Sequence, residues 1–89
     1  SDLVCGAENN PVLHDLSGYL VSLDKTPPTI RLATGSGEKT FHWNPGETGF
    51  FGHEGQEIEA SVFLRRFKHS SITLVFEGKT VVNVFAARF

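Results

Sequence analysis

Several residue types are scarce in this 89-residue chain, and each scarcity narrows what the protein can be. A single cysteine, Cys5, means that no disulfide within the chain can hold a small domain together. No run of 18 apolar residues occurs, so the sequence predicts no membrane-spanning helix. Basic residues number 8 against 10 acidic ones, and the chain therefore lacks the basic surplus that is typical of duplex-DNA binders.

Methionine is absent too, including at position 1. We therefore expect the chain to be cut from a longer protein, and we expect an extracytoplasmic or membrane-anchored location, with a cytoplasmic one as the alternative. Any contact with a membrane would come through segments outside this chain. Residues 1–12 are expected to form a flexible N-terminal tail, and residues 13–89 a single β-barrel domain.

Phenylalanine is plentiful, with 8 residues against one tyrosine and one tryptophan, and is expected to supply the core. Short alternating stretches separated by glycine- and proline-rich turns predict strands over 16–24, 29–34, 39–44, 56–67 and 70–89. The stretch 56–67 is interpreted as a strand with Ile58, Ala60, Val62 and Leu64 on one face. Phe63 and Phe67 then fall on its polar face, so either the strand bulges near Phe63 or both of its faces are covered there. No segment is predicted to form an amphipathic helix.

Two local predictions concern glycines. Gly18 lies inside the first strand and indicates a bulge or a tight bend. In the C-terminal hairpin, a three-residue loop around Gly78 is favoured because it sets Ile72 and Leu74 against the even-numbered valines. Replacing Leu74 by alanine is expected to cost about 2–5 kcal/mol, and replacing Thr73 much less.

Five or six short strands favour an all-β, small Greek-key barrel. The long first strand with its internal glycine, and the stretch "GQEIEASV" after the middle connection, resemble the OB-fold superfamily over residues 16–85. The alternative is an SH3-like barrel. Residues 44–55 depart from the OB pattern because they are too glycine-rich for the helix usual there, and the strand over 80–89 is more than five strands require.

The stretch "HWNPGETGFFGHEG", residues 42–55, is interpreted as the connection between the two halves of the barrel. Phe50 and Phe51 are expected to plug one barrel end. His42 and His53 lack the close spacing of recognisable zinc ligands, so no metal site and no cofactor are predicted. No nucleophile motif occurs either, and the protein is not expected to be an enzyme.

The basic and aromatic stretch "FLRRFKH" is the one candidate for ligand binding. Binders of single-stranded nucleic acid combine stacking rings with a basic groove, and OB-folds commonly host such sites. The predicted binding residues are Tyr19, Arg31, Trp43, Arg65, Arg66, Phe67 and Lys68. The alternative is that the rings belong to the core and the charges only solvate the end of a strand.

The sequence therefore predicts a non-enzymatic binding or interaction module, the soluble domain of an envelope or membrane-anchored protein. A protein is the expected partner. The alternative is a single-stranded nucleic-acid-binding domain, which the net charge of −2 disfavours.

Overall fold

The computed structural model describes residues 12–86, so the expected tail, except Val12, and Cys5 lie outside the described residues. The described chain forms strands and one short helix in a fixed order. These elements are β1 (His14–Lys25), β2 (Pro28–Thr34), β3 (Gly37–Trp43), β4 (Gly49–Phe51), β5 (Glu57–Ile58), α2 (Ala60–Phe67), β6 (Ser71–Glu77) and β7 (Thr80–Phe85). Among residues 12–86, no helix is long and apolar enough to cross a membrane.

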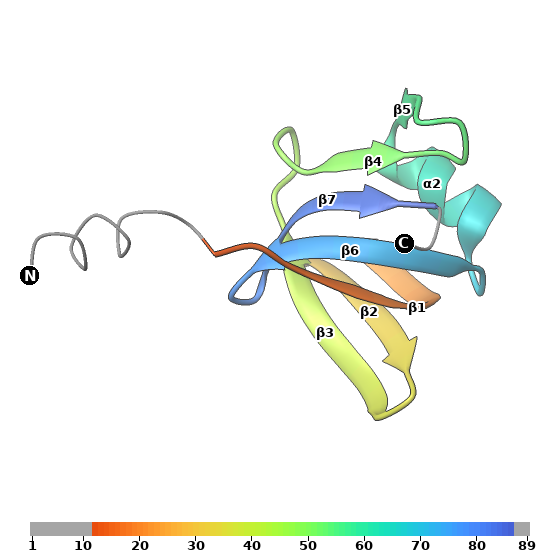
Figure 1. Cartoon of the computed structure of the whole chain (residues 1–89). Coiled ribbons are helices and arrows are strands. Elements are labelled where there is room, and N and C mark those ends of the chain that lie inside the picture. Colours follow the sequence, from red (N-terminus) through yellow and green to blue (C-terminus); the bar gives the residue numbers. More distant parts are fainter. Residues whose placement is uncertain (1–11, 87–89) are drawn as a thin grey trace, which may run out of the picture.

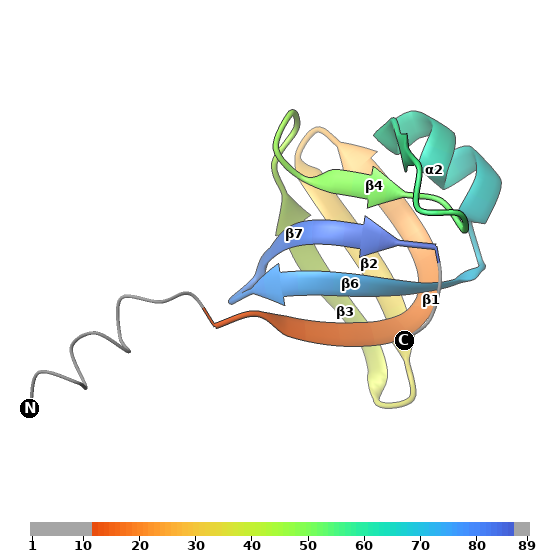
Figure 2. The same ribbon diagram turned by 45° about the horizontal axis from the view of Figure 1, so that its top comes forward.

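The strands form one sheet in the order β3-β2-β1-β6-β7-β4-β5. β1 serves two neighbours, because its first half pairs with β6 and its second half with β2. A short parallel pairing of β3 with β7, at His42–Thr80 and Trp43–Val81, closes five strands into a barrel (Figure 1, Figure 2). The predicted fold class, a small all-β barrel, is confirmed, and the arrangement is consistent with an OB-like fold.

The segment 56–67 is where the sequence prediction was wrong. Only Glu57–Ile58 is a strand, and Ala60–Phe67 is a helix that lies against one end of the barrel (Figure 2). Phe63 and Phe67 are its buried residues. Together with Ala60 and Leu64 they follow the i, i+3, i+4, i+7 spacing of an amphipathic helix. The helix therefore turns inward the two rings that a strand would have placed on its polar face.

A residue with unusual backbone geometry follows the end of the helix. His69 has φ of 67°, in the left-handed region that non-glycine residues rarely adopt. Its backbone N–H donates to the carbonyl oxygen of Leu20 at 2.7 Å, which ties the helix end to β1. Arg65 and Arg66 lie in the last helical turn, where positive charge is favourable next to the helix dipole.

The core is filled by aliphatic and aromatic side chains from every barrel strand and from α2. Phe63 is fully buried, and its ring centroid lies 5.4 Å from that of Phe50 and 4.9 Å from that of Phe67. Trp43 meets Phe50 edge-on at 5.3 Å. This line of rings covers the barrel end beneath the helix.

The connection between β3 and β5 has more structure than the sequence predicted. Residues 49–51 form β4, which pairs in parallel with β7. Phe50 is buried in the core, as expected of a ring that plugs a barrel end, but Phe51 is only half-buried and stacks on Phe85 with centroids 5.2 Å apart. α2 covers this end of the barrel, where Phe50 and Phe51 alone were expected, and Phe50 packs against Phe63 of the helix.

The C-terminal hairpin reaches the predicted register by a different route. Leu74 pairs with Val84, as predicted, but the turn has two residues, Gly78 and Lys79, because Glu77 pairs with Thr80. A shift in register between Val75 and Phe76 brings Leu74 opposite Val84, so that both side chains point to the same face of the sheet. The predicted three-residue loop is therefore wrong, and the additional residue lies within the strand pairing as a bulge.

Thr73 lies on the face opposite to Leu74 and is nevertheless 1% exposed. Its hydroxyl lies 2.8 Å from the hydroxyl of Ser17 on β1, which gives both groups a hydrogen-bond partner. Thr73 is therefore buried although it lies on the outer face of the barrel. Strand alternation alone predicts that its substitution is tolerated, and its burial counts against that prediction.

Gly18 marks a close approach of two strands. A Cβ atom built there would lie 2.5 Å from the carbonyl oxygen of Ala33 and 2.9 Å from the Leu32 side chain. The irregularity in pairing comes slightly later, between Leu20 and Ser22. Gly18 thus lets β1 pass close to β2 near the point where β1 changes partner from β6 to β2.

Candidate functional site

The predicted binding residues divide between the barrel surface, the core and the helix. Tyr19 and Arg31 lie on the outer face of β1 and β2. Tyr19 pairs with Ala33, two residues from Arg31, and its side chain is 53% exposed. The structure therefore brings these two predicted residues onto one surface.

The other two predicted rings lie in the core. Trp43 is 3% exposed, and its indole Nε1–H donates to the carbonyl oxygens of Asp24 at 2.9 Å and Thr29 at 3.2 Å. Phe67 is 8% exposed and packs against Phe63. Neither ring offers a face to a ligand in this conformation, which agrees with the alternative that these rings belong to the core.

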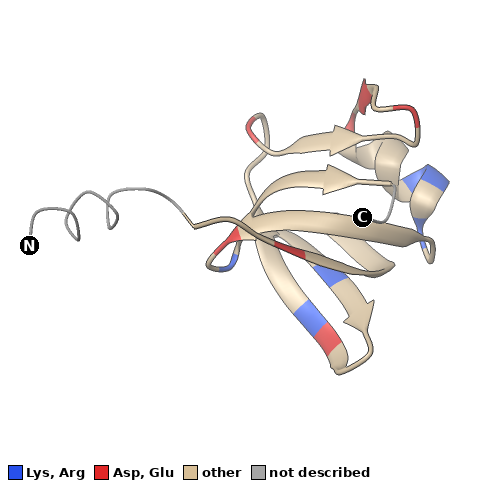
Figure 3. Ribbon diagram, in the orientation of Figure 1, with Lys and Arg blue, Asp and Glu red and all other residues tan. Residues whose placement is uncertain are grey.

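The predicted basic residues do not form one patch. Arg65 and Arg66 are exposed on the last turn of α2, and Lys68 follows them. Arg31 lies on β2, and its guanidinium Nε is 3.7 Å from a carboxylate oxygen of Glu38 on β3. Figure 3 shows basic residues in separate places, at the end of the helix, on the β2–β3 hairpin and in the β6–β7 turn.

The outer face of β2 and β3 offers little to stack on. Its members are the residues that alternate with the buried ones, namely Thr29, Arg31, Ala33, Glu38, Thr40 and His42. Apart from the imidazole of His42, they include no ring. This face is therefore poorly suited to base stacking, which requires several exposed aromatic side chains.

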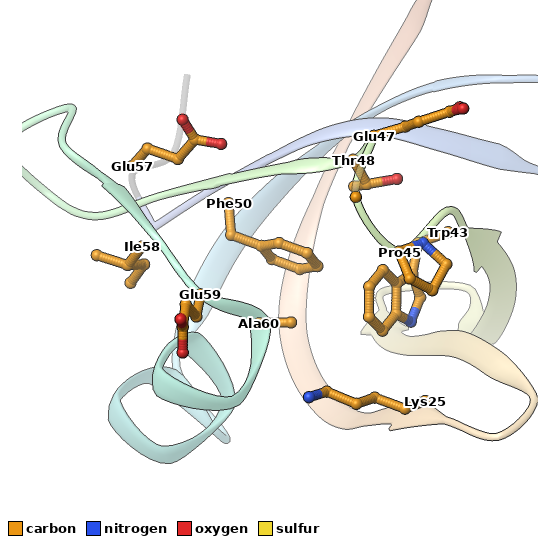
Figure 4. Close-up of a pocket in the computed structure, with 11 residues that line it drawn as sticks. Lys25, Trp43, Pro45, Glu47, Thr48, Phe50, Glu57, Ile58, Glu59 and Ala60 are labelled. Atoms are coloured by element: carbon orange, nitrogen blue, oxygen red, sulfur yellow. The ribbon is translucent and has the colours of Figure 1, made fainter.

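One hollow lies between the β3–β4 connection and the start of α2, with a volume of about 640 Å³. Its floor contains Phe50 and Ala60, and Lys25 lies at its side (Figure 4). Glu47, Glu57 and Glu59 line it as well, but Figure 4 shows their carboxylates pointing in different directions. A ligand pocket usually has polar groups that converge, and this hollow has none.

A second hollow, which we term the edge groove, lies where β3 meets the start of β1 and the β6–β7 turn. Its volume is about 550 Å³. Its lining comes from β1, β3, β6 and the β6–β7 turn and comprises His14, Asp15, Leu16, Lys39, Phe41, Phe76, Gly78 and Lys79. It thus combines an apolar base with charged groups at its rim, which is the usual composition of a binding site.

Aromatic contacts define the base of the edge groove. The rings of Phe41 and Phe76 lie 4.7 Å apart, and His14 lies 5.8 Å from Phe76 on the other side. The ammonium group of Lys79 sits 5.3 Å from the centre of the Phe41 ring, within the range of a cation–π contact. Lys39 projects to the same face of β3 as Phe41, because the two residues are two positions apart.

Beside the edge groove, one edge of β3 is open. The pairing of β3 with β7 covers only His42 and Trp43, so among residues 12–86 no strand lies along this edge at positions 37–41. β3 pairs with β2 on its other side over its whole described length except Trp43. The open edge spans about 17 Å, and Lys39 and Phe41 within it line the groove.

Sequence reasoning missed the edge groove, although one signal for it was available. The alternation in "KTFHWN" places Lys39 on the same face as Phe41 and Trp43, and a lysine among core residues indicates an opening at that end of the barrel. Phe76 and Lys79 could not be added from the sequence, because their place depends on how β7 meets β3.

The residues described in the structure contain no group of three or more histidine, cysteine, aspartate or glutamate side chains that could hold a metal ion. His42 is exposed on β3, and His53 meets the ring of Phe67 edge-on at 5.2 Å.

Comparisons with protein-family models, curated proteins and solved structures find no match to this chain.

Proposed function

We propose that this protein is a non-enzymatic binding module of the OB type that holds its ligand in the edge groove. The observation that carries this proposal is the groove itself, in which Leu16, Phe41 and Phe76 form an apolar base between two lysines. Clefts that combine a largely apolar lining with a few placed polar groups are the default binding sites of proteins.

The topology supports the OB assignment. The barrel strands follow one another as β1, β2, β3, β6 and β7, the helix lies between the third and fourth of them, and the third pairs in parallel with the fifth. OB barrels bind ligands on the face of their second and third strands and with the turns beside it, including the turn between the last two strands. In this chain that turn is Gly78–Lys79, which lines the edge groove.

The lining of the groove is suited to holding a charged ligand. Its ionisable groups are His14, Asp15, Lys39 and Lys79, all on exposed residues. Such groups can orient a ligand and select its charge.

A protein segment fits the groove better than an oligonucleotide. Stacking on bases requires exposed ring faces, and Phe41 is 2% exposed and already in contact with Phe76 and Lys79. Two lysines opposed by Asp15 also give few contacts to phosphates, whose neutralisation supplies most non-specific affinity. We therefore keep a protein as the proposed partner and single-stranded nucleic acid as the alternative.

The test is a selection of random peptides displayed on phage against the intact chain. Selected peptides are then measured on two variants with the same net charge, Lys39→Glu with Lys79→Glu in the groove, and Lys25→Glu with Lys68→Glu outside it. Loss of binding by the groove variant alone supports the proposal. If the selection yields no binders, or binders that both variants retain equally, the proposal is wrong, and a labelled oligothymidylate measured in parallel tests the alternative.

A further inference from the structure

We infer that the edge groove receives an acidic, extended peptide with an aromatic or large apolar residue, which adds as a strand to the open edge of β3. This inference rests on the proposed function and specifies its partner. It is carried by the free backbone groups of β3, by the position of the groove beside them and by the charges that border both.

The backbone of β3 presents free hydrogen-bonding groups at this edge. The β2–β3 hairpin has a two-residue turn, with Thr34 paired to Gly37, so Gly37, Lys39 and Phe41 direct their N–H and C=O groups toward β2. Glu38, Thr40 and His42 therefore direct theirs away from β2. The N–H of His42 confirms this direction, since it donates to the carbonyl oxygen of Lys79 at 2.7 Å.

β7 therefore uses only the last part of an edge that continues along β3. At Glu38 and Thr40 the same edge faces no strand of the described chain. An extended peptide that paired there would lie in line with β7 and end near Thr80. Main-chain hydrogen bonds give affinity in this mode of recognition, and pockets for alternate side chains give specificity.

The edge groove supplies such a pocket. Side chains of an added strand alternate between faces, so every second one would point to the face that Lys39 and Phe41 share. That face opens on the half-buried side chains of Leu16 and Phe76, and the buried ring of Phe41 lies against Phe76. An aromatic or large apolar residue of the peptide would pack there, while its neighbours pointed to solvent.

The charges at the groove select an acidic partner. Lys39 and Lys79 border the groove, whereas Glu38 points to the opposite face and lies 3.7 Å from Arg31. Asp15 is the acidic residue in the lining, so the two lysines leave the lining with one net positive charge. Opposite charges on directly opposed cross-strand positions are stabilising, so a carboxylate opposite Lys39 favours pairing.

The same lysine disfavours a second copy of this chain as the occupant. Two copies that paired antiparallel through Glu38 and Thr40 would place Lys39 directly opposite Lys39 of the other copy. Like charges in that position are destabilising. Charged residues, lysine above all, commonly protect exposed strand edges from self-association. Lys39 has this effect, and it can still pair with a carboxylate of an acidic peptide.

The test uses eight-residue synthetic peptides, measured by fluorescence anisotropy with the intact chain. One carries glutamate and phenylalanine in turn at every second position, with threonine between them, so that both can face Lys39 and Phe41. Its counterpart carries lysine in place of glutamate. Two further versions of the acidic peptide carry N-methyl groups on alternate amides, in one frame or the other. We expect the acidic peptide to bind at least about fivefold more tightly than the basic one. We also expect only one methylation frame to abolish binding.

Protein variants give the matching half of the test. Thr40→Pro removes an outward N–H while sparing the hydrogen bonds to β2, and edge strands tolerate proline in this orientation. We expect it to abolish peptide binding, with Lys39→Glu reducing affinity at least about fivefold and Lys68→Glu leaving it unchanged. Far-ultraviolet circular dichroism establishes that each variant is folded, and the methylated peptides test the same contacts should Thr40→Pro fail to fold.

The outcomes separate the inference from the proposed function. If the acidic peptide binds the groove but both methylation frames act alike, strand addition is wrong and the groove remains a binding site. If the basic peptide or an oligothymidylate binds as tightly, the acidic partner is wrong. If no peptide binds, or if all of them bind the groove variant unchanged, the proposed function fails as well.

Discussion

Replacing Phe63 by alanine tests the packing of α2 against the barrel. Phe63 is fully buried and lies between Phe50 and Phe67, with ring centroids 5.4 and 4.9 Å away. Removing a ring from such a site costs about 3–5 kcal/mol, because the transfer free energy is lost and a cavity remains. The stability of a domain this size is on the order of 5–10 kcal/mol, so the change removes a large part of it.

Val62→Ala is the matched control. Val62 is half-buried on α2, and alanine has the higher helix propensity, so we expect a cost below about 1 kcal/mol. If residues 60–67 formed a strand, Val62 would face the core and Phe63 the solvent, and the order of the two costs would be reversed. The pair of variants therefore distinguishes a helix from a strand by stability alone.

Urea unfolding followed by the fluorescence of Trp43 provides the assay, since the Trp43 indole packs edge-on against Phe50 beside the substituted site. With a slope of roughly 1–2 kcal/mol per molar urea, Phe63→Ala should lower the midpoint by about 2 M or more. Phe63→Leu, with an expected cost of roughly 1–2 kcal/mol, serves if the alanine variant does not fold. A larger effect of Val62→Ala than of Phe63→Ala would refute the packing described here.

Substitutions at three further local features extend these tests. Gly18→Ala should cost about 1–3 kcal/mol in thermal unfolding, because its Cβ would meet the Ala33 carbonyl; a neutral result would show that the strands can separate there. Thr73→Val and Ser17→Ala should each cost about 1 kcal/mol, and the double variant less than their sum, since both break one hydrogen bond; strict additivity would contradict that bond. His69→Gly should be neutral or stabilising by up to about 1 kcal/mol because φ is 67°, and a clear loss of stability would count against this reasoning.

Strand alternation predicted much of the barrel correctly. In residues 29–34 and 39–44, alternation places Ile30, Leu32, Phe41 and Trp43 on one face of each strand, and all four are buried. These strands have one solvated face, so burial and sequence pattern share a period of two residues. Where Thr73 is covered on the outer face as well, alternation alone no longer distinguishes buried from exposed positions.

The helix was missed because two periodicities coexist in one short segment. Ile58, Ala60, Val62 and Leu64 alternate as a strand would, whereas Phe63 and Phe67 are related by a helical turn. Burial of the two phenylalanine rings stabilises the fold more than burial of the four alternating aliphatic side chains, so the segment forms a helix. The aromatic residues that seemed out of place on a strand were the available signal.

The predicted binding residues depended on rings whose positions the sequence could not establish. Trp43 was counted as a candidate for stacking, although its alternation with His42 already placed it inward, where its N–H now bonds two backbone carbonyls. Lys39 could have indicated an opening in the barrel, but the full lining of the edge groove could not be predicted, because the groove exists only where the pairing of β7 with β3 ends at His42. That end point is a property of the closed barrel.

The position of β7 has a consequence for how the protein folds. β7 pairs with β6 along one side and, on the other, first with β3 and then with β4. The meander of β1, β2 and β3 can form from contacts close in sequence, but closure joins residues far apart in the chain and must overcome a larger loss of chain entropy. We therefore expect docking of β7 to limit the folding rate, and the groove at its start to appear only when the whole barrel does.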